Sequence, residues 1–346
     1  MDYRTDDISQ ARNAFQMSTA NCYVIRHAGW YKLPLVYGNA VLNGSPNVDA
    51  YAPFPSDHND NNLVLGVFKN HLDQEITSPF IENNAGCDAL TCEVLWQANG
   101  DAVQQLSIEG TPRSTDDYTA SNVRYLKFYM DPTRISQNNS LIAIKDDQGR
   151  VIWSWQIWST NDPLLLEAPI EVTSYAGNKY WFFQIPSIGR IIQNEYPSRP
   201  DVTITLAQDS PSTMPDLKVV IKQPALKMDG EYVTYQFGRK DPIRTGAKVY
   251  SYMVPTATAP VSLGTLIQYP GTFYSFTSSN NRYTTANGPK YKNLWSGKDT
   301  QVTGSPIERT PDMIKTIYDP SPIGYKVPAS GAYSGFTTTG VNSFWR

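Results

Sequence analysis

Residues 141–158 read LIAIKDDQGRVIWSWQIW. Two runs of aliphatic and aromatic residues flank Asp146-Asp147-Gln148-Gly149, and Asp and Gly are residues that tight turns favour. In the second run, apolar residues from Val151 to Ile157 recur at every second position, which is the period of a β-strand. The stretch therefore predicts a β-hairpin whose second strand points Trp153 and Trp155 into a hydrophobic core rather than presenting them as a carbohydrate-stacking surface.

Similar short apolar runs between turn residues recur along the whole chain of 346 residues. Tyr and Trp suit half-buried strands, and the 25 Pro and 22 Gly residues separate such strands by turns. The composition therefore predicts a mainly β protein. The strands that we expect lie at 22–25, 33–37, 63–68, 93–97, 123–129, 141–145, 150–158, 180–185, 202–206 and 218–222. A short helix is expected at residues 7–15.

The charge distribution bears on the class of partner. The formal net charge is −3, and the largest basic cluster is Arg239-Lys240 with Arg244. Nucleic-acid binding normally needs a basic stripe that neutralises phosphates, so we expect no nucleic-acid partner. No apolar run is long enough to cross a bilayer, and the start of the sequence lacks an apolar signal region. We therefore expect no transmembrane segment, and we expect any export signal to be absent from this sequence.

Several segments resemble, in the same order, fimbrillin-associated surface proteins of Bacteroides-type bacteria. The hairpin at 139–160 carries the resemblance most strongly, together with 20–25, 33–40, 70–72 and 92–97. Residues 235–242 (YQFGRKDP) and 315–328 (KTIYDPSPIGYKVP) resemble the major paralogous domain first named from Fibrobacter succinogenes. Gln156 stands where these proteins often carry His, so we interpret this position as structural.

This resemblance implies two main parts, a β-sandwich-like domain and an α+β domain similar to C-type lectins. The second part is expected to be incomplete, because the sequence stops at Ser343-Phe344-Trp345-Arg346 where such a domain would continue. The expected boundaries are a linker or the end of a preceding domain at 1–19, the sandwich at 20–165, a β-rich connecting segment at 166–225, and the partial lectin-like domain at 226–346.

The same resemblance implies an exported protein at the cell surface or anchored at the outer membrane. The expected function is that of an adhesin-type or fimbria-associated protein without enzymatic activity, which binds a host glycan, a host protein or pilin subunits. Long loops between 255 and 311 are the expected contact region, because exposed aromatic residues anchor interfaces well. The aromatic residues in these loops that we expect to contact a partner are Tyr269, Tyr274, Tyr283, Tyr291 and Trp295.

The three cysteines leave alternatives open from the sequence alone. Cys87 and Cys92 could close a short loop in an oxidising compartment, or all three thiols could be reduced and buried. An exported protein, as the resemblance implies, favours a Cys87–Cys92 disulfide. Cys22 near His27 is interpreted as an ordinary strand residue rather than a nucleophile, because no protease signature surrounds it.

The sequence contains no Gly-x-Ser-x-Gly elbow, no Gly-rich phosphate loop with Lys and Ser/Thr, and no His-Glu-x-x-His, so no catalytic, metal-binding or cofactor-binding residue is expected. Residues 57–62 (DHNDNN) lack the Gly and Glu of an oxygen-ligand calcium loop and are interpreted as a solvated loop. The turn Gly238-Arg239-Lys240-Asp241 fits a charged binding turn and a structural clamp equally well. The alternative function is a carbohydrate-active or formylglycine-type enzyme relative, since lectin-like folds also host chemistry.

Overall fold

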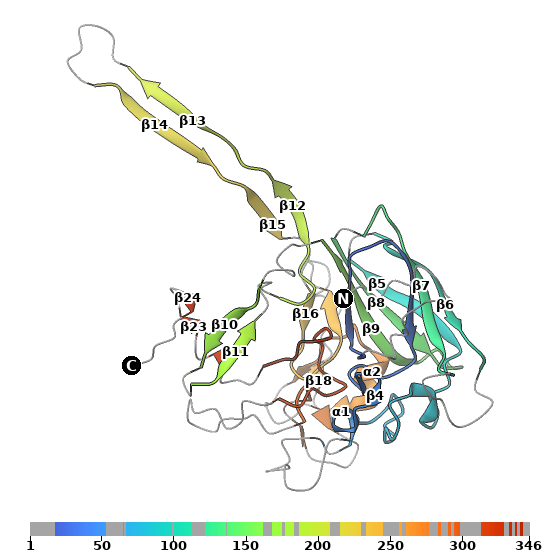
Figure 1. Cartoon of the computed structure of the whole chain (residues 1–346). Helices are drawn as coiled ribbons and strands as arrows, with labels where there is room; N and C mark the ends of the chain where they lie inside the picture. Colours follow the sequence, from blue (N-terminus) through green and yellow to red (C-terminus); the bar gives the residue numbers. More distant parts are fainter. Residues whose placement is uncertain are drawn as a thin grey trace.

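The computed structural model describes residues 18–52, 65, 67–98, 100–112, 122–135, 137–161, 168–174, 177–182, 187–207, 215–229, 233–244, 256–257, 261–276, 283–284, 290–291, 294–297, 313–328, 332–333, 336–337 and 340–341. The protein is mainly β, as the sequence predicts. Two sheets face each other in the body of the molecule, and a long two-stranded arm projects from it (Figure 1).

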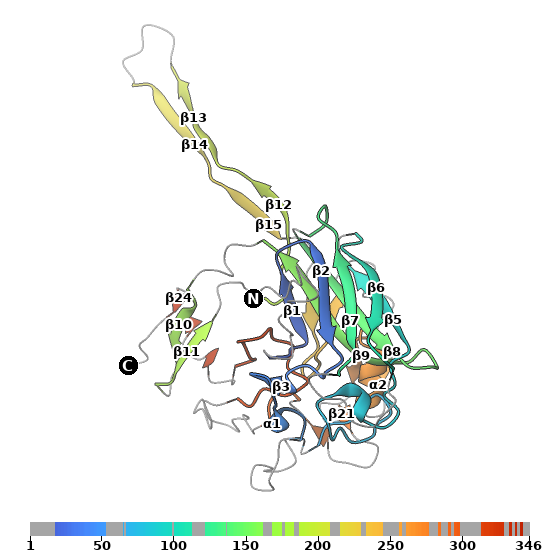
Figure 2. The ribbon, with the colours of Figure 1, turned by 45° about the vertical axis from the view of Figure 1, so that its right-hand side comes forward.

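The larger sheet has four strands in the order β1-β9-β8-β5, and the smaller has three in the order β2-β7-β6. The bounds are β1 (Cys22–Ile25), β9 (Val151–Thr160), β8 (Gln137–Lys145), β5 (Thr91–Gln97), β2 (Gly29–Pro34), β7 (Tyr125–Met130) and β6 (Val103–Glu109). Strand β1 is parallel to β9, and the other neighbours in both sheets are antiparallel. Figure 2 shows the strands of both sheets together in the body of the molecule.

The core between the sheets contains the side chains that strand periodicity selects. Trp153 pairs with Ile144 and Trp155 with Ile142 across the β8–β9 hairpin, so these side chains share one face. Both tryptophans are 0% exposed and belong to the same apolar cluster as Phe128 of β7. The prediction that Trp153 and Trp155 are core residues is therefore confirmed, and so is the hairpin.

The opposite face of β9 is also buried, which the alternating pattern alone did not predict. Segment 233–244 contains β16 (Val233–Tyr235) and β17 (Pro242–Arg244) and contacts this face through the polar side chains of Ser154 and Gln156. Trp158 lies on this face as well and donates its indole N–H to the carbonyl of Arg190. All ten residues of β9 are consequently buried.

Residues beyond 226 contribute to this same core. Leu263 and Ile267 of helix α2 (Leu263–Gln268), Leu294 and Tyr318 join the apolar cluster of the two sheets. The Nδ2 of Asn21 donates to the carbonyl of Ile317 at 2.6 Å, which joins residues 296 positions apart. Described residues of both expected domains thus pack together, and the lectin-like arrangement expected for 226–346 stays a prediction.

The arm consists of two consecutive antiparallel pairs. Strand β12 (Ile192–Tyr196) pairs with β15 (Leu226–Asp229), and β13 (Arg199–Leu206) pairs with β14 (Leu217–Gln223). Both views show the β13–β14 end far from the body (Figures 1 and 2). The expected strands 202–206 and 218–222 are therefore present, and they form the far part of the arm.

The remaining elements are short. They are β3 (Val41–Leu42), β4 (Ser45–Pro46), α1 (Val48–Tyr51), the 3₁₀ helix η4 (Ile81–Asn83), β10 (Ile170–Thr173), β11 (Lys179–Phe182), β18 (Thr256–Ala257), β19 (Val261–Ser262), β20 (Ser275–Phe276), β21 (Tyr283–Thr284), β22 (Lys290–Tyr291), β23 (Phe336–Thr337) and β24 (Gly340–Val341).

Two expected strands are wrong in part. The strand expected at 33–37 ends at Pro34, because Tyr37 turns away to donate its backbone N–H to Pro79. In the run expected at 63–68, the described residues lie in no strand, although Phe68 is buried. The expected helix at 7–15 and the loop at 57–62 lie outside the described residues.

Candidate functional site

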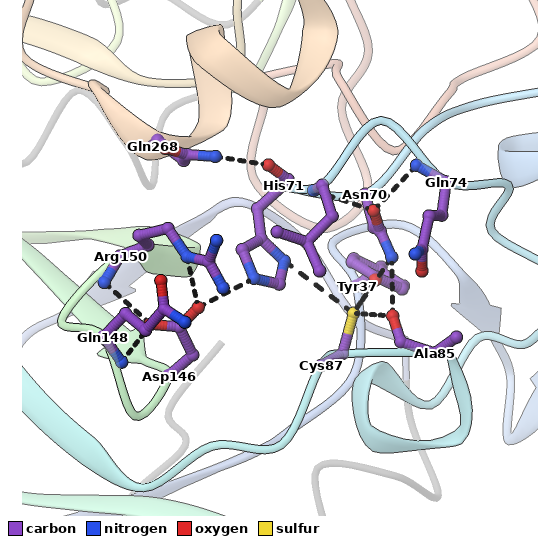
Figure 3. A network of polar contacts seen from close by, with 11 residues as sticks. Tyr37, Asn70, His71, Gln74, Ala85, Cys87, Asp146, Gln148, Arg150 and Gln268 are labelled. Carbon is purple, nitrogen blue, oxygen red and sulfur yellow. Dashed lines mark hydrogen bonds and ion pairs between the residues drawn. The ribbon is translucent and has the colours of Figure 1, made fainter.

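A buried polar cluster lies where the β8–β9 turn meets the loop around residue 71 (Figure 3). Asp146 opens the turn, and its Oδ1 accepts backbone N–H groups from Gln148 at 3.0 Å and Arg150 at 2.8 Å. Its Oδ2 accepts from Nε of Arg150 at 2.6 Å. Burial raises the pKa of Asp146, but these hydrogen bonds outweigh burial, and its pKa lies below the ordinary value.

His71 and Cys87 continue this cluster inward. Nε2 of His71 lies 3.4 Å from Oδ2 of Asp146, and its Nδ1 lies 3.9 Å from the sulfur of Cys87. Asn70 fixes the loop, because its Oδ1 accepts the backbone N–H groups of Leu72 and Gln74 while its Nδ2 lies 3.3 Å from the same sulfur. We call Asn70, His71, Cys87, Asp146 and Arg150 the His71 cluster.

The order of thiol, imidazole and carboxylate is the one that activates a cysteine nucleophile. In this structure, however, Cys87 and His71 are both 0% exposed, so a substrate cannot reach the sulfur. Burial lowers the pKa of His71, and the hydrogen bond and charge of Asp146 only partly oppose this. The arrangement therefore supports a structural role: it joins loop 70–74, residues 85–87 and the β8–β9 turn.

A cleft of about 600 Å³ adjoins the His71 cluster. Asp146 and Arg150 form part of its wall, and Glu82 pairs with Arg124 there at 2.9 Å with both side chains buried. Ligand pockets are usually lined mostly by apolar side chains, whereas charged residues predominate here. The lining consists of Leu72, Glu82, Gly86, Asp88, Leu90, Pro112, Arg124, Asp146, Asp147 and Arg150.

The turn Gly238-Arg239-Lys240-Asp241 is a structural clamp. Nζ of Lys240 donates to the carbonyl of Ser154 at 3.0 Å and to Oδ1 of Asp241 at 2.5 Å, with 2% of the residue exposed. The guanidinium of Arg239 donates to backbone carbonyls at the end of α2, among them Leu266 and Tyr269 at 2.9 Å. Of the two interpretations of this turn, the structure supports the clamp.

Of the five aromatic residues expected to contact a partner, the three whose side chains the structure describes differ in exposure. Tyr269 is exposed, but Tyr274 is buried, which corrects the prediction for that residue. Trp295 is half-buried and packs on Phe237, because its indole N–H donates to the carbonyl of Arg239 at 2.8 Å. Tyr283 and Tyr291 lie in β21 and β22, and their side chains fall outside the described part of the chain.

The expected disulfide is absent from the structure, in which Cys22, Cys87 and Cys92 are all free. Its absence has a physical reason, since the Cys87 sulfur points to Tyr37 and Asn70 while Cys92 lies in β5 opposite Ile144. Burial raises the pKa of both the Cys22 and Cys92 thiols. Cys22 is therefore an ordinary buried strand residue, as predicted.

One surface was not recognised from the sequence, namely an apolar face of the arm. In β13–β14 the pairs Val202–Ile221, Ile204–Val219 and Leu206–Leu217 lie directly opposite each other, so all six side chains share one face. Each is between 43% and 60% exposed. We call these six residues the apolar row. The alternation Val-Thr-Ile-Thr-Leu at 202–206 signals such a face, but it would signal a buried one equally well.

The other face of β13–β14 is mainly polar. Thr203 pairs with Val220 and Thr205 with Lys218, so these four side chains point to the face of the ribbon that is turned away from the apolar row. Val220 is the apolar exception, at 51% exposed. The ribbon is therefore amphipathic across its thickness, like one layer of a sandwich that lacks its second layer.

Comparison of this chain with protein-family models, with curated proteins and with solved structures gave no match. Within the described residues, no helix is long and apolar enough to span a membrane, and no three His, Cys, Asp or Glu side chains are grouped so that they could hold a metal ion.

Proposed function

We propose that this chain is an exported, adhesin-type protein of the cell surface or of a fimbrial assembly, and that it binds a protein partner through the arm. One observation carries the proposal: a two-stranded ribbon leaves the body and exposes the six aliphatic side chains of the apolar row (Figure 1). Aliphatic faces of this kind on projecting elements mark sites of association.

The magnitude of the apolar row supports binding to protein. Complete burial of a Val, Leu or Ile side chain contributes about 1.5–3 kcal/mol, so covering six half-exposed ones contributes roughly 5–9 kcal/mol. Association costs an estimated 4–15 kcal/mol. Covering the row is therefore comparable with the whole cost of forming a complex, whereas glycans, being polar, would leave the aliphatic groups without suitable contacts.

In this proposal the body of the protein holds the arm in position for binding. Its two sheets share one apolar core, and the turn around Lys240 fixes segment 233–244 to the outer face of β9. Just before the arm begins, a hydrogen bond from the Trp158 indole N–H to the carbonyl of Arg190 ties the chain to β9. Partner contact consequently moves from the loops at 255–311, where it was expected, to the arm.

Display and binding are tested separately. Proteinase treatment of intact cells should degrade the chain, as detected with an antibody against the body, while a cytoplasmic marker survives. For binding, purified fimbriae and a glycan array are probed with the wild-type chain and with a variant in which an Asn-Gly turn replaces residues 199–223. We expect binding to fimbriae that is lost in the variant. Glycan binding that persists in the variant, or a chain that proteinase does not reach, would contradict the proposal.

A further inference from the structure

We infer that the arm contains a hinge, at which β13–β14 swings relative to β12–β15 and to the body. The hinge consists of two short segments, Pro197-Ser198 between β12 and β13 and Pro224-Ala225 between β14 and β15. We call these four residues the joint. On either side of the joint the arm forms a separate two-stranded sheet, so the ladder of the arm is interrupted in both strands.

The register shows that the two segments of the joint face each other. Tyr196 pairs with Leu226 on the body side of the joint, and Arg199 pairs with Gln223 on the far side. Two residues separate these pairs in either strand, so a continuous ladder would form two rungs in the joint, each with one proline. The register therefore permits the ladder to continue, and the residues of the joint are what interrupts it.

The two prolines remove hydrogen-bond donors from the ladder. In antiparallel pairs, rungs that exchange two backbone hydrogen bonds alternate with rungs that exchange none. One of the two rungs of the joint would therefore be a hydrogen-bonded rung, and because either rung contains a proline, one of its two N–H donors is missing. Within the described residues, no backbone hydrogen bond joins the two segments of the joint. The two strands of the arm are consequently held together least at this level.

A β-bulge weakens the pairing directly beyond the joint. The register shifts between Arg199 and Val202, so β13 contributes an extra residue there. Bulges leave the extra residue unpaired and bend the strand. The amide side chain of Gln223 donates to the carbonyl of Pro200 at 3.0 Å and thus contacts the bulge. Between Tyr196 and Val202, all in the described part of the chain, Arg199–Gln223 is the one pair of the ladder.

The arm is fixed to the body before the joint and is uncovered at the joint itself. The carbonyl groups of Gly189 and Arg190, just before β12, accept hydrogen bonds from the side chains of Asn139 and Trp158 in the large sheet. All four residues of the joint are exposed, and both views show β12–β15 between the body and β13–β14 (Figures 1 and 2). Bending at the base of the arm would break these hydrogen bonds, whereas bending at the joint would not.

A hinge at this place suits an arm whose apolar row meets another protein. The row lies entirely in β13–β14, beyond the joint, so a swing changes the direction of the row and leaves its composition intact. A partner surface can then be met at different angles while the body stays in place. This use rests on the proposed function, but the hinge is a property of the chain alone and is tested without a partner.

The hinge is tested by pulsed electron paramagnetic resonance, which gives the distribution of distances between two spin labels. The labels are attached in a Cys92→Ser background, since the other two native cysteines are buried. One label is placed on the body at the exposed position of Asp101→Cys. The second is placed beyond the joint, on the polar face of the ribbon, at Thr205→Cys, or just before the joint at Tyr196→Cys.

Thr205 lies about 23 Å beyond the joint at the usual rise of about 3.3 Å per strand residue, so a swing of about 20° moves it by about 8 Å. We therefore expect the distances to Thr205 to spread over about 8 Å more than those to Tyr196. Pro197→Thr combined with Pro224→Thr restores both missing N–H groups and should narrow the Thr205 distribution to the width found for Tyr196. Pro200→Thr adds an N–H inside the bulge, so it is the matched control and should leave the distribution broad.

Other results would overturn the hinge. Equally narrow distributions for Thr205 and Tyr196 in the otherwise wild-type arm would show that the ladder is stiff at the joint. Equally broad ones would place the movement at the base of the arm. A double threonine variant that folds, as judged by circular dichroism, but stays as broad as the wild type would show that the prolines are not the cause. If this variant does not fold, the comparison of the two label positions in the otherwise wild-type arm still decides. None of these results bears on whether the apolar row binds a partner.

Discussion

The ammonium group of Lys240 lies 4.3 Å from the centre of the Trp153 ring, and both side chains are closed off from solvent. The same nitrogen donates to the carbonyl and the hydroxyl of Ser154 and to Asp241. Burial lowers the pKa of Lys240 to about 8, although the Asp241 carboxylate acts in the opposite direction. A charged clamp thus holds segment 233–244 against β9.

Removal of one partner of this clamp should be costly. Asp241→Leu leaves the Lys240 charge buried without its carboxylate partner, and we expect a loss of about 3–5 kcal/mol in the free energy of unfolding. The double variant Lys240→Met, Asp241→Leu should lose less than Asp241→Leu, because no buried charge remains unpaired. Urea unfolding of the wild type, of Lys240→Met, of Asp241→Leu and of the double variant gives the coupling energy. Losses that simply add would show that the two side chains do not act as a pair.

The three thiols should behave as free cysteines. In unreduced protein unfolded in urea, iodoacetamide should add three groups, as measured by intact mass. In folded protein it should add at most one, because Cys22 is 1% and Cys87 0% exposed, whereas Cys92 is partly exposed. Alkylation requires the thiolate form. Burial raises the pKa of Cys22, so this thiol stays protonated and reacts more slowly still. Two missing labels in the unfolded, unreduced protein would reveal the disulfide that the resemblance implied.

The buried imidazole predicts that the protein loses stability in mild acid. Burial lowers the pKa of folded His71 below its ordinary 6.5, so the unfolded chain binds the proton more readily. Because unfolding then takes up a proton, the free energy of unfolding falls as the pH falls below about 6.5. We expect this decrease in wild type and a weaker one in His71→Asn, from urea unfolding between pH 7 and 5. His27→Asn, at an exposed position, is the control and should keep the wild-type slope. A steeper loss in His71→Asn would mean that Asp146 stabilises the imidazolium more than burial opposes it.

The sequence predicted the strands better than it predicted which residues pack against them. Periodicity placed Trp153 and Trp155 in the core, and two of the four arm strands, β13 and β14, were predicted close to their true positions, whereas β12 and β15 were not predicted. It could not show that β9 is buried on both faces, because the covering residue Lys240 lies 86 positions from Ser154. The alternation in β13 likewise predicts an apolar face without stating what packs on it. The His71 cluster was missed for the same reason: its imidazole, thiol and carboxylate groups come from two loops and a turn, which have no common period.

Gly189 and Gly149 offer a matched pair for testing how closely the chain just before the arm approaches β9. Both have the left-handed backbone that glycine favours, with φ of +76° and +75°. A Cβ at Gly149 would meet nothing within 4 Å, so Gly149→Ala should lose only the backbone cost of about 1–2 kcal/mol. A Cβ at Gly189 would lie 2.4 Å from Cγ2 of Val233 and 2.7 Å from Nε2 of Gln156.

Gly189→Ala should therefore lose a further 1–3 kcal/mol or so, the usual cost of overpacking. The displaced groups matter, since Gln156 donates to Asn139 at 2.7 Å, and Asn139 in turn donates to the carbonyl of Gly189 at 2.5 Å. Both variants are compared with wild type by urea unfolding at one pH. Equal losses in the two variants would mean that residues 187–191 can move away from β9, and that the arm is attached to the body less rigidly than these contacts indicate.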